Sequence, residues 1–326
     1  MKKISGTKIP GSDVIARHLV ESGAYTDKDT PVLLTSGESL TPYFLNTEKL
    51  CRDLNIGSFL DQHGDKSHVI IDHAYKLCLD NPNFQQDIDI IIKGVYELTK
   101  NCSMCAISGG QRRDWIFSGP VARSIGLPHI SLYKQELGKR DEIEIVYPNG
   151  GVVHRDNGDL TLPFEKVVHI ADLITKGSSI YSKGEDGKEF GWVPMLRSRN
   201  VKINDLFAVV TRLQGGEELL QNLEEPVNHH VYVAIDEEFL RTHSKQPGVV
   251  LDYIGDEIEW TQNYLIQNGI DVLVPYFEPN GNKLPRATKF LRNYRDFLEE
   301  TDLIGKLGTI VQGKYNKSLN DIVGGN

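Results

Sequence analysis

The chain has 326 residues, of which 39% are hydrophobic and 25% charged, and its formal net charge is −9. This length allows one large domain or two modest ones. The negative charge, without a long basic run, argues against nucleic-acid binding as the main task. No apolar run approaches the roughly 20 residues that span a membrane, and the start, Met1-Lys2-Lys3, lacks the apolar stretch of a secretory signal. We therefore expect a cytoplasmic protein without a membrane partner.

The cysteines do not form a recognisable metal site. The chain has four, at Cys51, Cys78, Cys102 and Cys105. The last two make a C-x-x-C pair, but no second pair or histidine cluster completes a zinc site. We predict that the thiols are reduced and lie in the core.

The first hundred residues combine helices with one extended pair. An amphipathic pattern predicts a helix over residues 13–22, and residues 66–79 and 87–100 repeat that pattern. Residues 32–46 contain two extended segments around Ser36-Gly37-Glu38. The second segment carries Tyr43 and Phe44, which belong either to a ligand site or to the core of a plain hairpin.

From residue 102 the pattern alternates between strands and helices. Strands are expected at residues 102–107, 129–133, 167–174 and 206–211, and a helix at residues 120–125. Residues 141–155 form two alternating segments around Pro148-Asn149-Gly150-Gly151, which predicts a hairpin. Residues 192–201 favour a helix. This alternation predicts an α/β fold with an open, largely parallel sheet and flanking helices.

Three of these strands are followed by residues suited to an anionic ligand. The first is followed by Ser108-Gly109-Gly110-Gln111-Arg112-Arg113-Asp114, in which two arginines supply forked donors for a diphosphate. Lys134 follows the second, and Arg212 follows the strand at residues 206–211. Ligands in such sheets bind at the carboxyl ends of the strands. The plain alternatives are a solvated helix start and a surface arginine.

Residues 167–179, VVHIADLITKGSS, are the most specific stretch. A buried strand leads to Asp172 and then to a loop of small and hydroxyl residues, Thr175-Lys176-Gly177-Ser178-Ser179. Such a loop, opening a helix, presents N–H groups and hydroxyls to a phosphate. A carboxylate such as Asp172 can accept two hydrogen bonds from a vicinal diol. The stretch therefore predicts a site for a phosphate and a sugar diol, although an ordinary strand–turn–helix remains the alternative.

This stretch is similar to the phosphoribosyl-pyrophosphate (PRPP) motif of type I phosphoribosyltransferases, which normally has two adjacent acids where this chain has Ala171 and Asp172. Residues 32–46 and 210–217 resemble the corresponding segments of orotate phosphoribosyltransferases. By this resemblance, Gly109, Gly110, Gln111, Arg112, Arg113 and Lys134 would bind the diphosphate, Thr175–Ser179 the 5′-phosphate, and Asp172 the ribose diol and Mg²⁺, directly or through water or substrate. Catalysis is assigned to Asp172, Lys134 and Arg113.

The resemblance also implies a base site and a reaction, in which a pyrimidine base is joined to PRPP and pyrophosphate is released. Tyr43, Phe44 and Arg212 would hold a pyrimidine, with orotate expected, and a homodimer is implied. The family's basic residue before Ser-Gly is replaced by Thr35, and its catalytic loop is replaced by the hairpin with Lys139, Arg140 and His154. The alternatives are therefore a catalytically degenerate PRPP- or nucleotide-binding regulatory protein, and a scaffold protein that acts through its C-terminal part.

We divide the chain into an N-terminal hood (1–60), a phosphoribosyltransferase-like core (61–225) and an appended C-terminal α/β subdomain (226–326). In the last, strands are expected at residues 231–235 and 270–275, and helices at residues 257–268, 287–298 and 304–311. No catalytic pattern is visible in this subdomain.

Overall fold

The computed structural model describes residues 7–34, 36–51, 58–59, 66–134, 142–156, 161–184 and 186–324. The chain forms two compact units. One comprises Lys2–Tyr25 and Asn46–Phe239, and the other comprises Thr26–Leu45 and Leu240–Asn326. Each is described by itself below.

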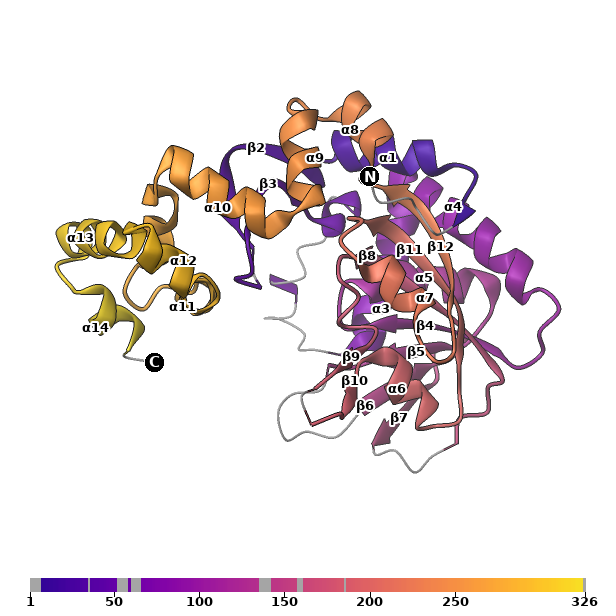
Figure 1. The fold of residues 1–326 in the computed structure, drawn as a ribbon. Coiled ribbons are helices and arrows are strands. Elements are labelled where there is room, and N and C mark those ends of the chain that lie inside the picture. Colours follow the sequence, from indigo (N-terminus) through magenta and orange to yellow (C-terminus); the bar gives the residue numbers. More distant parts are fainter. Residues whose placement is uncertain are drawn as a thin grey trace. The chain divides into compact units, whose positions relative to one another are not determined.

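The larger unit is built on an eight-stranded sheet in its described part, with the order β1-β12-β11-β8-β4-β5-β6-β7 (Figure 1). The strands are β1 (Thr7–Lys8), β4 (Cys105–Gly110), β5 (His129–Leu132), β6 (Glu142–Val146), β7 (Val152–Asp156), β8 (Lys166–Ile174), β11 (Ile203–Thr211) and β12 (Asn228–Ala234). All neighbours from β1 to β5 pair in parallel, whereas β6 and β7 are antiparallel. The predicted α/β class with an open, largely parallel sheet is confirmed.

Helices cover both faces of this sheet, which explains why its central strands are apolar along their whole length. On one face lie α1 (Ser12–Glu21), α3 (Ser67–Asp80), α4 (Pro82–Thr99) and α5 (Asp114–Ile125); on the other lie α6 (Trp192–Arg197) and α7 (Gly216–Gln221). Every residue of β4 is buried, and β8 is buried over most of its length. A short 3₁₀ helix, η1 (Thr47–Cys51), also belongs to this unit.

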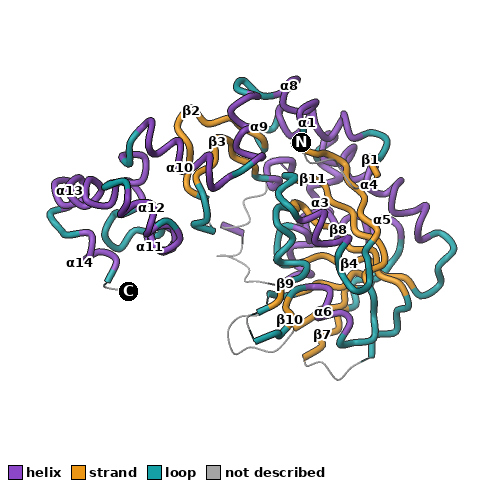
Figure 2. The backbone as a smooth tube through the Cα atoms, in the orientation of Figure 1, coloured by secondary structure: helices purple, strands orange, loops and turns teal. Residues whose placement is uncertain are grey.

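The smaller unit combines an extended pair with helices (Figure 2). Strands β2 (Tyr25–Leu33) and β3 (Leu40–Leu45) form a two-stranded sheet, as predicted for residues 32–46. The helical elements are α8 (Glu237–His243, which begins in the larger unit), α9 (Pro247–Gly255), α10 (Glu257–Asn268), η2 (Asp271–Tyr276), α11 (Leu284–Asn293), α12 (Arg295–Glu300), α13 (Leu303–Tyr315) and α14 (Leu319–Val323). The predicted helix over 257–268 is confirmed.

The C-terminal part differs from the predicted α/β subdomain. The segment predicted as a strand at residues 270–275 is the 3₁₀ helix η2, because a short apolar run suits a buried helical turn as well as a strand. The strand expected at residues 231–235 is β12, which extends the main sheet. The larger unit therefore ends at Phe239 rather than near residue 225.

The predicted N-terminal hood is also divided differently. Leu33 and Leu40 belong to the apolar cluster of the C-terminal helices. The backbone N–H of Leu33 donates to the Tyr276 hydroxyl at 3.0 Å. Residues 26–45 therefore fold with the end of the chain, because their apolar side chains find their partners there.

The cysteine prediction is wrong for one pair. Cys102 and Cys105 form a disulfide, while Cys51 and Cys78 are free and buried. The turn before β4 brings the two Cα atoms to 5.7 Å, which lies in the range that a disulfide requires.

Candidate functional site

The connections after β4 and β8 leave the sheet on opposite faces. Strand β4 leads to α5 on one face, and β8 leads toward α6 on the other. Neighbouring parallel strands whose connections diverge in this way leave a crevice at their carboxyl ends, where ligands of open α/β sheets bind. A cavity of about 690 Å³ lies there. It is lined by Glu48, Gln111, Arg112, Arg113, Asp114, Lys134, Ala171, Asp172, Leu173, Ile174, Thr175, Lys176, Gly177, Ser178, Ser179, Ile180 and Trp192.

The loop after β4 supplies cationic side chains to this cavity. Arg112 and Arg113 are exposed at its edge, and Arg113 Nε donates to Glu48 at 2.8 Å. The loop is tied to the end of β5, because Gln111 Oε1 accepts from the Lys134 N–H at 2.7 Å. The structure thus brings Gln111, both arginines and Lys134 together, as predicted.

The two glycines of this loop have a packing role. A Cβ on Gly109 would lie 2.2 Å from Ser118 Oγ, and one on Gly110 would lie 2.4 Å from the Trp192 ring. Neither glycine lines the cavity. They are required because α5 and Trp192 lie against this backbone.

The loop after β8 supplies a backbone turn with exposed hydroxyl and amine groups. Gly177 has φ +72°, a conformation that glycine adopts without steric cost. The N–H groups of Ile180 and Tyr181 donate to its carbonyl at 2.9 and 3.0 Å. Lys176, Ser178 and Ser179 are exposed. This geometry suits a phosphate group.

The helix that we expected after this loop is interrupted. One helical turn ends at Tyr181, and a hairpin of β9 (Ser182–Lys183) and β10 (Glu189–Phe190) follows before α6. The N–H groups of Trp192 and Val193 nevertheless donate to Ser179 and Ile180 carbonyls at 3.1 and 3.0 Å. The hairpin therefore lies between one helical turn and α6, which are joined by these two hydrogen bonds.

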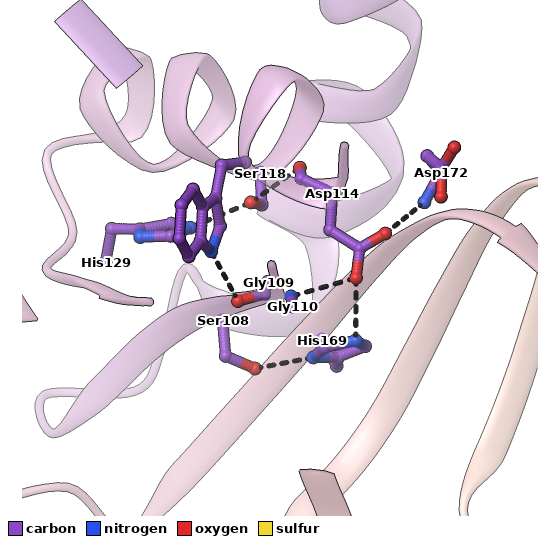
Figure 3. A network of polar contacts seen from close by, with 9 residues as sticks. Ser108, Gly109, Gly110, Asp114, Ser118, His129, His169 and Asp172 are labelled. Carbon is purple, nitrogen blue, oxygen red and sulfur yellow. Dashed lines mark hydrogen bonds and ion pairs between the residues drawn. The ribbon is translucent and has the colours of Figure 1, made fainter. Parts of the chain in front are cut away.

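Two acids, Asp114 and Asp172, line the cavity. Figure 3 shows them as neighbours. The side chain of Asp172 accepts a hydrogen bond from the Thr47 hydroxyl at 2.5 Å. The backbone N–H of Asp172 donates to Asp114 Oδ1 at 2.8 Å. Both side chains are largely buried. The two acids come from different elements, because Asp114 begins α5 and Asp172 lies near the end of β8.

The environment separates the protonation of the two acids. Burial, together with the neighbouring Asp114 charge, raises the pKa of Asp172 to about 7. Burial acts to raise the pKa of Asp114 as well, but the His169 ring 3.7 Å away and the hydrogen bond from the Asp172 N–H outweigh it, so that this pKa is lowered. At neutral pH we therefore expect Asp114 to be ionised and Asp172 to be close to half protonated.

Four residues in or next to the cavity lining were not assigned a role from the sequence: Thr47, Glu48, Asp114 and Trp192. Asp114 directly follows Arg113, and an acid in the first turn of a helix after a glycine-rich loop was the available signal. Thr47, Glu48 and Trp192 carry no local pattern, because their proximity to the loops depends on the fold.

The residues predicted to bind the base do not line this cavity. Tyr43 is fully buried and packs edge-to-face on Tyr253, with ring centroids 6.0 Å apart. Phe44 is 40% exposed, and Arg212 is 6% exposed with its N–H bonded to the Ile174 carbonyl. Thr35, Lys139 and Arg140 lie outside the described residues, as does the side chain of His154.

Among the described residues, three or more His, Cys, Asp or Glu side chains do not gather into a metal cluster. Asp172, which lines the cavity, is the residue expected to hold Mg²⁺, an ion that proteins commonly bind through one or two carboxylates together with substrate phosphates. Within the same part of the chain, the helices are too short or too polar to span a membrane.

A second cavity, of about 790 Å³, lies within the smaller unit. Its walls carry four acids, Asp29, Asp252, Asp256 and Glu259, and one lysine, Lys28. This balance disfavours a polyanionic ligand. The crevice between β4 and β8, with two arginines and two lysines in its lining, suits a polyanionic ligand better.

No family model and no curated protein matches the chain. Solved structures similar to it include UMP synthase from Leishmania donovani, with TM-score 0.46, 14% identity, and coverage of 75% of this chain and 42% of that one. Orotate phosphoribosyltransferase from Aeropyrum pernix has TM-score 0.44 and 15% identity, covering 70% and 98%. Adenine phosphoribosyltransferase from L. donovani has TM-score 0.42 and 10% identity, covering 76% and 89%. At these values, the chemistry of the site has to be argued from its own residues.

Proposed function

We propose that this chain is a phosphoribosyltransferase that binds PRPP in the crevice between β4 and β8 and transfers the phosphoribosyl group to a pyrimidine base, with orotate the expected base. The observation that carries the proposal is the lining of one cavity. A phosphate loop with Asp172 comes from β8, and Gln111, two arginines and Lys134 come from the neighbouring connections. A 5′-phosphate, a ribose diol and a diphosphate are the three groups that this arrangement suits.

The reaction replaces the bond between the anomeric carbon and the diphosphate oxygen by a bond to a base nitrogen. Pyrophosphate leaves with the electron pair, and the base nitrogen gives up its proton. Arg112, Arg113 and Lys134 supply fixed positive charge where the leaving group gains negative charge. Asp172 accepts hydrogen bonds from the ribose hydroxyls and so orients the sugar.

Mg²⁺, when bound, would neutralise the diphosphate. Asp172 is the side chain that we propose to hold it, directly or through water or substrate, together with oxygens of PRPP. For the base, Arg212, Tyr43 and Phe44 remain the proposed residues, because a guanidinium can clamp an acidic pyrimidine with two parallel hydrogen bonds. The homodimer and the cytoplasmic location remain predictions.

A second candidate is a PRPP- or nucleotide-binding regulatory protein without turnover. The buried Ala171, which stands where the family has an acid, favours it, as do base residues that do not line the cavity. Such a protein would bind PRPP and leave it intact.

The deciding experiment measures pyrophosphate release from PRPP and Mg²⁺ with orotate, uracil, adenine or hypoxanthine, beside calorimetric titration of PRPP alone. We expect release with orotate and little with the neutral bases. Tight PRPP binding without release for any base would identify the regulatory protein. Release with a purine alone would refute the base assignment, and the absence of PRPP binding would refute the site.

A further inference from the structure

One buried carboxylate is bonded to the backbone of both loops that line the cavity. Asp114 Oδ2 accepts from the Gly110 N–H at 2.8 Å, at the start of the loop after β4. Asp114 Oδ1 accepts from the Asp172 N–H, also at 2.8 Å, at the end of β8. Figure 3 shows the carboxylate between the two backbones. Each of its oxygens therefore fixes one of the loops.

Two buried side chains, His169 and Ser108, lie beside this carboxylate. His169 Nε2 lies 3.7 Å from Asp114 Oδ2, and Ser108 Oγ is 2.9 Å from His169 Nδ1 (Figure 3). The three side-chain types match a hydrolytic triad, but Ser108 and His169 have no exposed surface, so Ser108 has no access to a substrate. This pair is consequently a support for Asp114.

The backbone of Asp114 is fixed as well. The Ser118 hydroxyl donates to its carbonyl at 2.8 Å and lies 2.8 Å from His129 Nε2. A carboxylate whose position is determined by packing and hydrogen bonds can set the spacing of the groups bonded to it.

We propose that Asp114 is a positioning residue that holds Gly110 and Asp172 at a fixed separation, so that a ligand with both a diphosphate and a ribose diol engages the two loops at once. This inference rests on the proposed function. Asp114 thereby takes part of the role of the acid that Ala171 replaces, from a different strand connection.

The sign of a substitution effect separates positioning from simple electrostatics. Asp114→Asn and Glu48→Gln each remove one negative charge from the lining of the same cavity. If charge alone mattered, both variants would bind the polyanion PRPP more tightly. If Asp114 positions the loops, Asp114→Asn should weaken PRPP binding and Glu48→Gln should strengthen it. Only Asp114 joins the loops, whereas Glu48 pairs with the exposed Arg113.

The measurement is calorimetric titration of PRPP with Mg²⁺, of ribose 5-phosphate and of pyrophosphate into each protein. For Asp114→Asn we expect PRPP affinity to fall about 10- to 100-fold, the range for a lost charge-assisted hydrogen bond. Each fragment should lose less than about threefold, since either loop alone can adjust to it. Glu48→Gln should bind PRPP more tightly. Equal or tighter PRPP binding by Asp114→Asn would overturn the proposal, as would equal losses for PRPP and its fragments.

A second arm needs no ligand. Hydrogen exchange of the Gly110 and Asp172 amides should be faster in Asp114→Asn than in wild type, and also in His169→Gln, which removes only the support. Unchanged exchange at both amides would overturn the loop-joining role. If wild type binds no PRPP while both amides exchange faster in the variants, the proposed function fails and the joining of the loops stands.

Discussion

The two loops of the crevice follow adjacent parallel strands but continue differently. The loop after β4 leads directly into α5, and residues from three other elements contact it. The Leu132 carbonyl accepts from the Gln111 N–H, Trp192 packs on Gly110, and the Asp172 N–H donates to Asp114 at the end of the loop. The loop after β8 makes one helical turn and is then interrupted by the β9–β10 hairpin. Both loops are held by other elements, since the Thr175, Ser179 and Ile180 carbonyls of the second loop accept from the N–H groups of Gly216, Trp192 and Val193. The second loop differs in that its turn also depends on a left-handed residue, Gly177.

This difference predicts how well each loop tolerates substitution. In the first, the contacts with Leu132, Trp192 and Asp114 hold the backbone, and its residues have no positive φ. In the second, Gly177 alone provides the left-handed residue on which the turn depends. The following predictions are arranged from the largest expected effect to the smallest.

Substitution at Gly177 should damage the site most. In Gly177→Ala, a left-handed alanine would be strained and its Cβ would lie 2.9 Å from Leu219 Cδ2. We expect a penalty of about 2–3 kcal/mol on the bound geometry, or about 30- to 150-fold in PRPP affinity. Gly187→Ala is the matched control, because Gly187 has φ +79° but lies in the inserted hairpin with open space around it. Calorimetry that showed the same loss in both variants would refute the backbone role of Gly177.

Asp172→Asn should reduce PRPP affinity about 10- to 100-fold, since it replaces a carboxylate acceptor by an amide. With a pKa of about 7 in the free protein, Asp172 is mostly protonated at pH 6 and mostly ionised at pH 8. Wild-type affinity should therefore rise about tenfold across that range through this group. In Asp172→Asn, the pH dependence of PRPP affinity that remains comes from the ligand. Identical pH slopes in the two proteins would contradict the assignment.

The same pKa predicts the sign of a stability effect. The folded state binds the Asp172 proton more tightly than the unfolded state, whose pKa lies near 3.8. The contribution of this group is thus fully present below that value and is lost as pH rises toward 7. Denaturant unfolding at pH 5 and pH 8 should show wild type losing stability relative to Asp172→Asn at the higher pH.

The sequence was sufficient for β4, β5, β6, β7, β8, β11 and β12 and for most of the cavity lining, because apolar periodicity and strand-end loops are local signals. It did not predict β1, β9 or β10. Asp114 was visible but received no role, since its two backbone partners are 4 and 58 residues away. The division of the chain could not be predicted, because residues 26–45 pack on helices that lie some two hundred residues later. The hairpin insertion also escaped prediction, since the hydrogen bonds that join the two helix parts span it.

Removing the inserted hairpin should have the smallest effect. Deletion of residues 182–190 joins Tyr181 to Gly191 and places Trp192 four residues after Ser179, the spacing of the hydrogen bond that already exists. The second helix part would then continue the first without moving the Trp192 ring from Gly110. The deletion removes the half-buried contacts of Glu189 with Tyr181 and Arg197. We expect PRPP affinity within about threefold of wild type, in line with surface contacts of low value.

A one-residue change in the deletion provides the control. Deletion of residues 182–189 retains Phe190 and moves Trp192 one position along the helix, a rotation of about 100°. The ring could then no longer pack on Gly110, where the present fit leaves no room for a Cβ. This variant should bind PRPP at least about tenfold more weakly than the in-register deletion, with a lower melting temperature, as expected when a buried aromatic loses its site. If both deletions weakened PRPP binding equally, the hairpin itself would contribute to the ligand site. The loop after β8 would then depend on the hairpin, just as the loop after β4 depends on its neighbours.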